Sequence, residues 1–175
     1  MKMIHMNVPG HPEATLEGYI LDCELSLGQS QDRPAVVVCP GGGYRRVSQR
    51  EGEPIALHFL PHGYNVFVLW YSVSPNRFPT QLREVAAAME LLHENAEAWH
   101  CDTDKIAIMG FSAGGHLAAH YSNAYHWPEV REMFPRSKPG SATLLCYPVM
   151  KMPAWKAISW IVSCPWGRKL PAPPF

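Results

Sequence analysis

The 175-residue sequence lacks the features that mark several specialised classes of protein. Charged residues make up only 17%, and 15 Lys and Arg balance 15 Asp and Glu, whereas a nucleic-acid binder normally shows a basic excess. The longest apolar run before residue 150, at 66–71, is far shorter than a membrane span, and residues 1–10 carry no apolar run typical of a signal peptide. We therefore expect a cytoplasmic protein with neither a nucleic-acid nor a membrane partner.

Cysteine is scarce and its spacing carries no metal or disulfide pattern. The five cysteines form an odd number without a CxxC pair, which favours reduced, mostly buried thiols. His116 and His120 are spaced like a metal pair, but position 117 is Leu and not the Glu of an H-E-x-x-H motif. We therefore expect core or surface histidines, no metal and no cofactor.

Acidic residues are absent from the last part of the sequence. Residues 1–150 hold 11 basic and all 15 acidic residues, a net charge of −4. Residues 151–175 hold four basic residues, five of the 17 prolines and three of the six tryptophans. A shifted reading frame, a truncated gene or a disordered tail explains this change of composition. The alternative is a divergent tail that folds as a Trp-rich cap over a sheet.

Short apolar runs and helical patterns alternate along residues 1–150. Four runs predict strands buried on both faces of a parallel sheet, namely 35–39, 66–73, 105–109 and 142–147. The segment 14–27 alternates in hydropathy and predicts an antiparallel edge strand or hairpin. Helical patterns occupy 53–62, 80–99 and 113–121. The order predicts an α/β fold with a doubly wound, mostly parallel sheet and helices on both faces.

The predicted strand 105–109 runs directly into Gly110-Phe111-Ser112-Ala113-Gly114, a G-x-S-x-G motif between a strand and a helix. In this context the motif is typical of a nucleophile elbow, a tight turn in which the glycines avoid clashes of Cβ atoms. Ser112 is therefore the candidate nucleophile, exposed at the carboxyl end of the sheet. The alternative is a glycine-rich turn that only closes a parallel strand.

A second glycine-rich segment, Pro40-Gly41-Gly42-Gly43-Tyr44, follows the predicted strand 35–39. A loop of this type can direct backbone N–H groups toward an oxyanion, together with the N–H that follows the nucleophile. The candidate donors are thus Gly42, Gly43 and Ala113, and Tyr44 is a candidate substrate contact. A flexible loop or a phosphate-binding turn is the alternative, although no GK[ST] or G-x-G-x-x-G motif is present.

These motifs resemble the α/β-hydrolase superfamily, in its esterase/lipase-like group that includes acetyl-xylan-esterase-like enzymes, feruloyl-esterase-like domains and relatives of prolyl-type peptidases. The resemblance implies a Ser–His–Asp hydrolase acting on small carboxylic esters, often acetyl or other short acyl groups on carbohydrate. It assigns Ser112 as nucleophile and Gly42, Gly43 and Ala113 as oxyanion donors, while Pro40 replaces the His found in many lipases. The matching stretches are 34–59, 63–73, 78–119 and 144–149.

The resemblance stops before the rest of the triad, which should follow in the order acid and then His. The sequence has no Asp after Asp104, and the later acids and histidines all precede the predicted strand 142–147, after which the triad acid should lie: Glu129, Glu132, His116, His120 and His126. We therefore expect residues 1–150 to be the N-terminal part of an α/β-hydrolase domain, incomplete after the strand at 142–149, with little or no turnover. The exposed sheet edge then predicts self-association. The alternative is a non-catalytic binding fragment or a pseudoenzyme.

Overall fold

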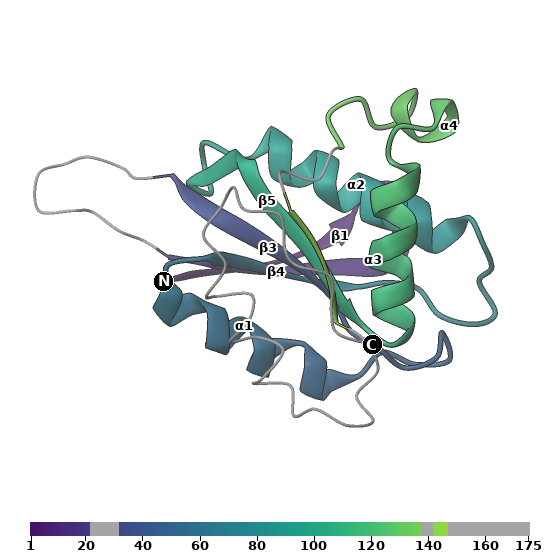
Figure 1. The fold of residues 1–175 in the computed structure, drawn as a ribbon, viewed down its shortest axis with the longest axis horizontal. Coiled ribbons are helices and arrows are strands. Elements are labelled where there is room, and N and C mark those ends of the chain that lie inside the picture. The colour runs from purple at the N-terminus through teal and green to yellow at the C-terminus, as the bar shows by residue number, and fades with distance from the viewer. Residues whose placement is uncertain (22–31, 138–141, 147–175) are drawn as a thin grey trace, which may run out of the picture.

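The computed structural model describes residues 1–21 and 32–137 and the backbone of a strand at 142–146. In these residues six strands form one sheet in the order β1-β2-β4-β3-β5-β6 (Figure 1). The strands are β1 Lys2–Val8, β2 His11–Ile20, β3 Arg33–Cys39, β4 Asn65–Trp70, β5 Cys101–Phe111 and β6 Ala142–Cys146. The tail at 151–175 lies outside the described residues.

The sheet is mostly parallel, as the sequence predicts. Strands β4, β3, β5 and β6 run parallel to one another, whereas β1 and β2 form an antiparallel hairpin and β2 pairs with β4 antiparallel. The segment 14–27 was expected at an edge or in a hairpin. Its first part lies in β2, which pairs with both β1 and β4, so the hairpin is confirmed and β1 forms the edge. Residues 22–27 lie outside the described residues.

Helices cover both faces of the sheet (Figure 1). Alternate side chains of β3 face opposite sides: Val36 and Val38 pack with Phe59, whereas Val37 belongs to a core with Met89. This alternation is what a strand buried on both faces requires. Within the described residues, no helix is long and apolar enough to cross a bilayer. The helices are α1 Glu53–Phe59, α2 Thr80–Glu94, α3 Ala113–Ala124 and α4 Pro128–Arg131, with 3-10 turns at Gln49–Glu51 and Leu60–His62.

The helix boundaries differ from the sequence predictions by a few residues. The pattern at 53–62 is divided into α1 and a 3-10 turn, which ends at Gly63 in the left-handed conformation (φ 84°). The helix predicted over 80–99 ends at Glu94, although its predicted apolar stripe is buried as far as Leu92. The helix predicted over 113–121 continues to Ala124.

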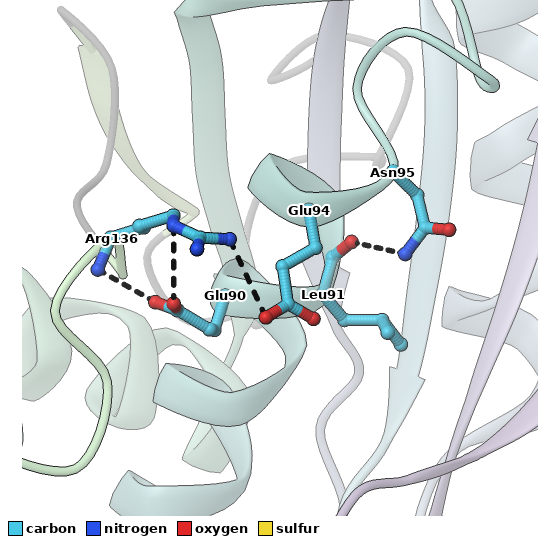
Figure 2. Close-up of polar contacts among 5 residues, drawn as sticks. All are labelled: Glu90, Leu91, Glu94, Asn95 and Arg136. Atoms are coloured by element: carbon cyan, nitrogen blue, oxygen red, sulfur yellow. Dashed lines mark hydrogen bonds and ion pairs between the residues drawn. The ribbon is translucent and has the colours of Figure 1, made fainter.

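Arg136, in the segment after α4, forms a hydrogen bond and ion pairs with helix α2 (Figure 2). Its backbone N–H donates to a Glu90 carboxylate oxygen at 2.7 Å, and its guanidinium lies 3.9 Å from Glu90 and 3.5 Å from Glu94. Next to it, the buried Tyr121 hydroxyl donates to the Ser137 carbonyl at 2.8 Å. These bonds hold the chain against α2 and α3 shortly before it enters β6.

Candidate active site

Ser112 occupies the sharp turn between β5 and α3. Its backbone has φ 50° and ψ −115°, a region that costs energy for a residue with a Cβ, and its side chain is exposed. The turn is tight on both sides of the serine. A Cβ added to Gly110 would lie 2.2 Å from the Gly114 carbonyl oxygen, and one added to Gly114 would lie 2.0 Å from the Cys39 carbonyl oxygen. Both glycines of the motif are therefore required by backbone contacts.

The serine stands at the N-terminus of α3. Its carbonyl accepts the first helical hydrogen bond, from the His116 N–H at 2.9 Å, and Ala113 is the first residue of the helix. The first N–H groups of a helix have no partner within it, so the Ala113 N–H is available and carries part of the helix dipole. In the part of the chain that the structure describes, no side chain hydrogen bonds to the Ser112 hydroxyl. None of the described residues is therefore hydrogen-bonded to the Ser112 hydroxyl in the position of a general base.

The glycine loop orients two further N–H groups through its carbonyls. The Gly41 carbonyl accepts from the Ser48 N–H at 2.8 Å, and the Gly42 carbonyl accepts from the N–H groups of Arg45 and Arg46 at 3.2 and 3.3 Å. In a trans peptide unit the N–H points opposite to the C=O. The N–H groups of Gly42 and Gly43 therefore point away from the 45–48 turn, and they donate to no group among the described residues.

The loop and the serine turn are in direct contact although about 70 residues separate them in the sequence. The Gly114 backbone approaches the Cys39 and Pro40 carbonyls so closely that no Cβ would fit. A Cβ on Gly41 would lie 2.7 Å from the Phe111 carbonyl oxygen. The two segments follow β3 and β5, which are neighbouring parallel strands, so their carboxyl ends meet at one edge of the sheet. The structure thus brings the predicted donors and the predicted nucleophile together.

Tyr44 links the loop to helix α3. Its hydroxyl and Nδ1 of His116 are 2.9 Å apart, its carbonyl accepts from the Ser74 N–H at 2.8 Å, and its ring centroid lies 5.8 Å from that of Tyr71. Burial raises the pKa of Tyr44 to about 12, so the hydroxyl stays protonated at neutral pH. Tyr44 lies at the site as expected, with its hydroxyl engaged by His116. A contact between Tyr44 and substrate remains a prediction.

Within the described part of the chain, the two buried thiols and the histidines of α3 form neither a nucleophile pair nor a metal site. Cys39 and Cys101 are buried free thiols, and burial raises the pKa of Cys39 to about 12, which keeps it neutral. His116 is exposed, and its ring centroid lies 6.0 Å from that of His120. Among the residues that the structure describes, no three His, Cys, Asp or Glu side chains gather in a way that could hold a metal ion.

Two residues of the site escaped the sequence analysis. The Glu51 carboxylate accepts a hydrogen bond from the Gly41 N–H at 2.7 Å, and the buried Tyr71 hydroxyl donates to the Pro40 carbonyl at 2.6 Å. The bonded pairs are 10 and 31 positions apart in the sequence. No motif spacing signals either contact, because each depends on how the chain returns to the loop.

A doubly wound, mostly parallel sheet with a tight serine turn after β5 defines an esterase-like α/β-hydrolase. The family model BD-FAE matches residues 21–133, and the chain belongs to this family. Its sequence is 35% identical over 128 residues to endo-1,4-beta-xylanase B of Butyrivibrio fibrisolvens, covering 67% of this chain and 20% of that protein. It is 30% identical over 135 residues to an acetylxylan esterase of Xylanibacter ruminicola, covering 77% and 26%.

Among solved structures, the carboxylesterase Cest-2923 of Lactobacillus plantarum superposes with a TM-score of 0.72 at 29% identity, covering 90% of this chain and 61% of the other. These relatives support ester hydrolysis as the activity of the family. The chain spans only about a fifth to a quarter of the length of these two curated relatives.

Proposed function

We propose that this chain carries the nucleophile and the oxyanion-binding half of a serine esterase, with Ser112 as nucleophile. The observation that carries the proposal is the pairing of an exposed serine with three N–H groups that have no partner among the described residues. These N–H groups belong to Gly42, Gly43 and Ala113, on two segments in backbone contact. Donors that are fixed before the reaction stabilise developing negative charge without reorganisation.

In the proposed reaction, the Ser112 Oγ attacks the ester carbonyl carbon while a base removes the hydroxyl proton. The carbonyl oxygen becomes an oxyanion and accepts hydrogen bonds from the three N–H groups. The ester C–O bond then breaks, the alcohol leaves with the proton, and water releases the carboxylic acid from the acyl serine. The same turn geometry that exposes Ser112 places it at the start of α3, whose dipole favours the oxyanion.

The base is the missing element of this proposal. The triad follows the order serine, acid and His, and both partners should come after the strand at 142–146, but this sequence has no Asp, Glu or His after Glu132. His116 is engaged by the Tyr44 hydroxyl at 2.9 Å. Loss of a His–Asp pair costs on the order of 6–8 kcal/mol of transition-state stabilisation. The 175-residue chain alone should therefore turn over esters very slowly.

As substrates we propose small esters of short acyl groups, including acetylated carbohydrate. The support is the acetylxylan esterase among the relatives. The edge strand β6 has a neighbour on one side only in the described sheet, so we also propose self-association through that edge.

A second candidate is a binding fragment or pseudoenzyme without hydrolytic activity. It is favoured by the absence, among the described residues, of any group bonded to the Ser112 hydroxyl. In that case the free N–H groups would hold an anionic ligand and Ser112 would not be acylated.

The two candidates are separated by supplying the base from solution. Hydrolysis of p-nitrophenyl acetate is measured at increasing imidazole concentrations for the wild-type chain and for Ser112→Ala. Imidazole also cleaves the ester by itself, so the variant gives the background rate. The esterase proposal predicts a saturable wild-type rate at least about tenfold above that of the variant. It also predicts an acetyl group on Ser112 in peptide mapping. Equal rates for both proteins at every imidazole concentration, with no acetylated serine, would support the binding fragment.

A further inference from the structure

The peptide unit between Pro40 and Gly41 is held at both of its ends by side chains. At one end, the Tyr71 hydroxyl donates to the Pro40 carbonyl at 2.6 Å. At the other end, the Gly41 N–H donates to the Glu51 carboxylate at 2.7 Å. Tyr71 is only 2% exposed, and burial raises the pKa of its hydroxyl well above the ordinary value, so it remains a donor. This peptide plane therefore cannot rotate without breaking a buried or charge-assisted hydrogen bond.

The clamped unit is the first of three consecutive peptide units in the loop. The next two carry the N–H groups of Gly42 and Gly43, whose carbonyl ends are held only by backbone bonds of the 45–48 turn. Glycine restricts φ and ψ very little, so a run of three glycines has no intrinsic preference for one direction of its N–H groups. The orientation of the first plane consequently sets the starting direction for the two that follow.

The surroundings show that the carboxylate of Glu51 is committed to this contact. Among the described residues the Glu51 carboxylate forms no ion pair. The Glu51 backbone N–H donates to the Ser48 carbonyl at 3.1 Å, and the Ser48 N–H in turn donates to the Gly41 carbonyl. A Cβ on Gly41 would lie 2.9 Å from Glu51 Oε2 and 2.7 Å from the Phe111 carbonyl oxygen. The carboxylate and the end of β5 thus enclose Gly41 from two directions.

We propose that Glu51 and Tyr71 are positioning residues of the esterase site, which hold the glycine loop so that the Gly42 and Gly43 N–H groups address the oxyanion. This inference rests on the proposed function of Gly42 and Gly43 as donors. Neither side chain touches the reacting atoms in this scheme. Both act through the Pro40–Gly41 peptide unit, and their loss disorients the donors without removing them.

The experiment compares Glu51→Ala and Glu51→Gln with the wild-type chain, and uses Glu53→Ala as the matched control. Glu53 is an exposed carboxylate two positions further along the chain. Two readouts are measured: hydrogen exchange of the Gly41, Gly42 and Gly43 amides by NMR, and imidazole-assisted acetylation of Ser112. The first readout does not depend on catalysis, whereas the second gives a rate constant and a half-saturating ester concentration.

For Glu51→Ala we expect faster exchange at Gly41, shifted resonances at Gly42 and Gly43, and an acetylation rate constant lower by about 10- to 100-fold. The half-saturating concentration should stay unchanged, because ground-state contacts are untouched. Glu51→Gln keeps an acceptor oxygen and should remain within about fivefold of wild type. Glu53→Ala should match wild type in both readouts.

The proposal is overturned if the Gly42 and Gly43 resonances of Glu51→Ala match those of the wild type, or if Glu51→Gln loses as much activity as Glu51→Ala. If Glu51→Ala does not fold, Tyr71→Phe tests the other end of the same peptide unit by removing one oxygen atom, with the same expected shifts. Failure of the proposed function is a separate result: the wild type and Ser112→Ala would then hydrolyse the ester at equal rates with no acetyl group on Ser112, while the amide resonances still report on the clamp.

Discussion

The two ends of the parallel strands differ in whether their backbone polar groups have hydrogen-bond partners. At the carboxyl ends of β3 and β5, three N–H groups have no partner among the described residues, and the exposed Ser112 has a positive φ of 50°. At the amino end of β4, the fully buried Asn65 accepts from the Leu21 N–H at 2.9 Å and donates to the Trp99 carbonyl at 2.8 Å. At the amino end a buried side chain supplies partners to backbone groups, whereas the carboxyl end leaves three N–H donors without a partner among the described residues.

The two ends of the strands also differ in what they contribute to the stability of the fold. Buried polar groups that find partners contribute to stability or at least avoid a desolvation cost. A non-glycine residue such as Ser112 at φ 50° costs on the order of 1–3 kcal/mol, which the buried strand and helix on either side must offset. Mutations at the amino end should therefore lower stability without changing the reactivity of Ser112, whereas mutations at the carboxyl end can change both.

The largest effect is expected at the carboxyl end, from Gly114→Ala. The added Cβ would meet the Cys39 carbonyl oxygen at 2.0 Å and the Pro40 carbonyl oxygen at 2.5 Å, so α3 must move away from β3. We expect a loss of about 3–5 kcal/mol in the free energy of unfolding, measured by urea denaturation. Gly43→Ala is the control, since no atom lies within 4 Å of its Cβ position and only its φ of 65° is unfavourable. Its expected loss is about 1–2 kcal/mol, and equal losses would contradict the packing argument.

A smaller loss is expected at the amino end, from Asn65→Ala. This change leaves the Leu21 N–H and the Trp99 and His100 carbonyls without their side-chain partner. We expect a loss of about 2–3 kcal/mol in unfolding free energy. Because the site lies at the other end of the strands, imidazole-assisted acetylation of Ser112 in the folded protein should not change. The exposed Asn123→Ala is the control for stability, and a fall in acetylation rate would show that the two ends are coupled.

The smallest effect concerns the pH dependence of stability. His120 stacks on Phe78, with ring centroids 5.3 Å apart, and contacts Trp127 and His116. Burial, followed by repulsion from His116, lowers the pKa of His120 below its ordinary value of 6.5. The unfolded chain therefore binds this proton more readily, and His120 lowers stability as the pH falls below about 6.5.

His120→Gln removes this titration. The melting temperature of the variant relative to wild type should rise as the pH is lowered from 7 to about 5. Above pH 7 the difference between the two proteins should be constant, because His120 is neutral in both states. A difference that does not change over the whole range would show that His120 does not titrate differently in the folded protein.

The sheet and the serine turn could be predicted from local sequence. The apolar runs at 35–39 and 105–109 lie within β3 and β5, because strands buried on both faces need continuous apolar residues. The strand β1 was not predicted, since its side chains are largely exposed and carry little pattern. The short helix α4, Pro128–Arg131, was also missed because four residues are too few for periodicity.

At the site, the sequence identified the groups on the two motifs but not the groups that hold them. The spacing within the two motifs predicted four residues of the site: Ser112, Gly42, Gly43 and Ala113. Glu51 and Tyr71 reach the loop from outside its motif, by hydrogen bonds that only the folded chain creates. The direction of the unpartnered N–H groups of the loop could likewise be inferred only from the hydrogen-bond partners of the loop carbonyls in the folded chain.

In the proposed reaction, the oxyanion formed at Ser112 accepts hydrogen bonds from the N–H groups of Gly42, Gly43 and Ala113. The most direct test is a crystal structure of the chain after reaction with an alkyl fluorophosphonate in the presence of imidazole. We expect a phosphonate on Ser112 Oγ whose free oxygen lies within hydrogen-bond distance of the three N–H groups. A phosphonate on another residue, or on Ser112 with its oxygen turned to solvent and the three N–H groups unbound, would contradict it.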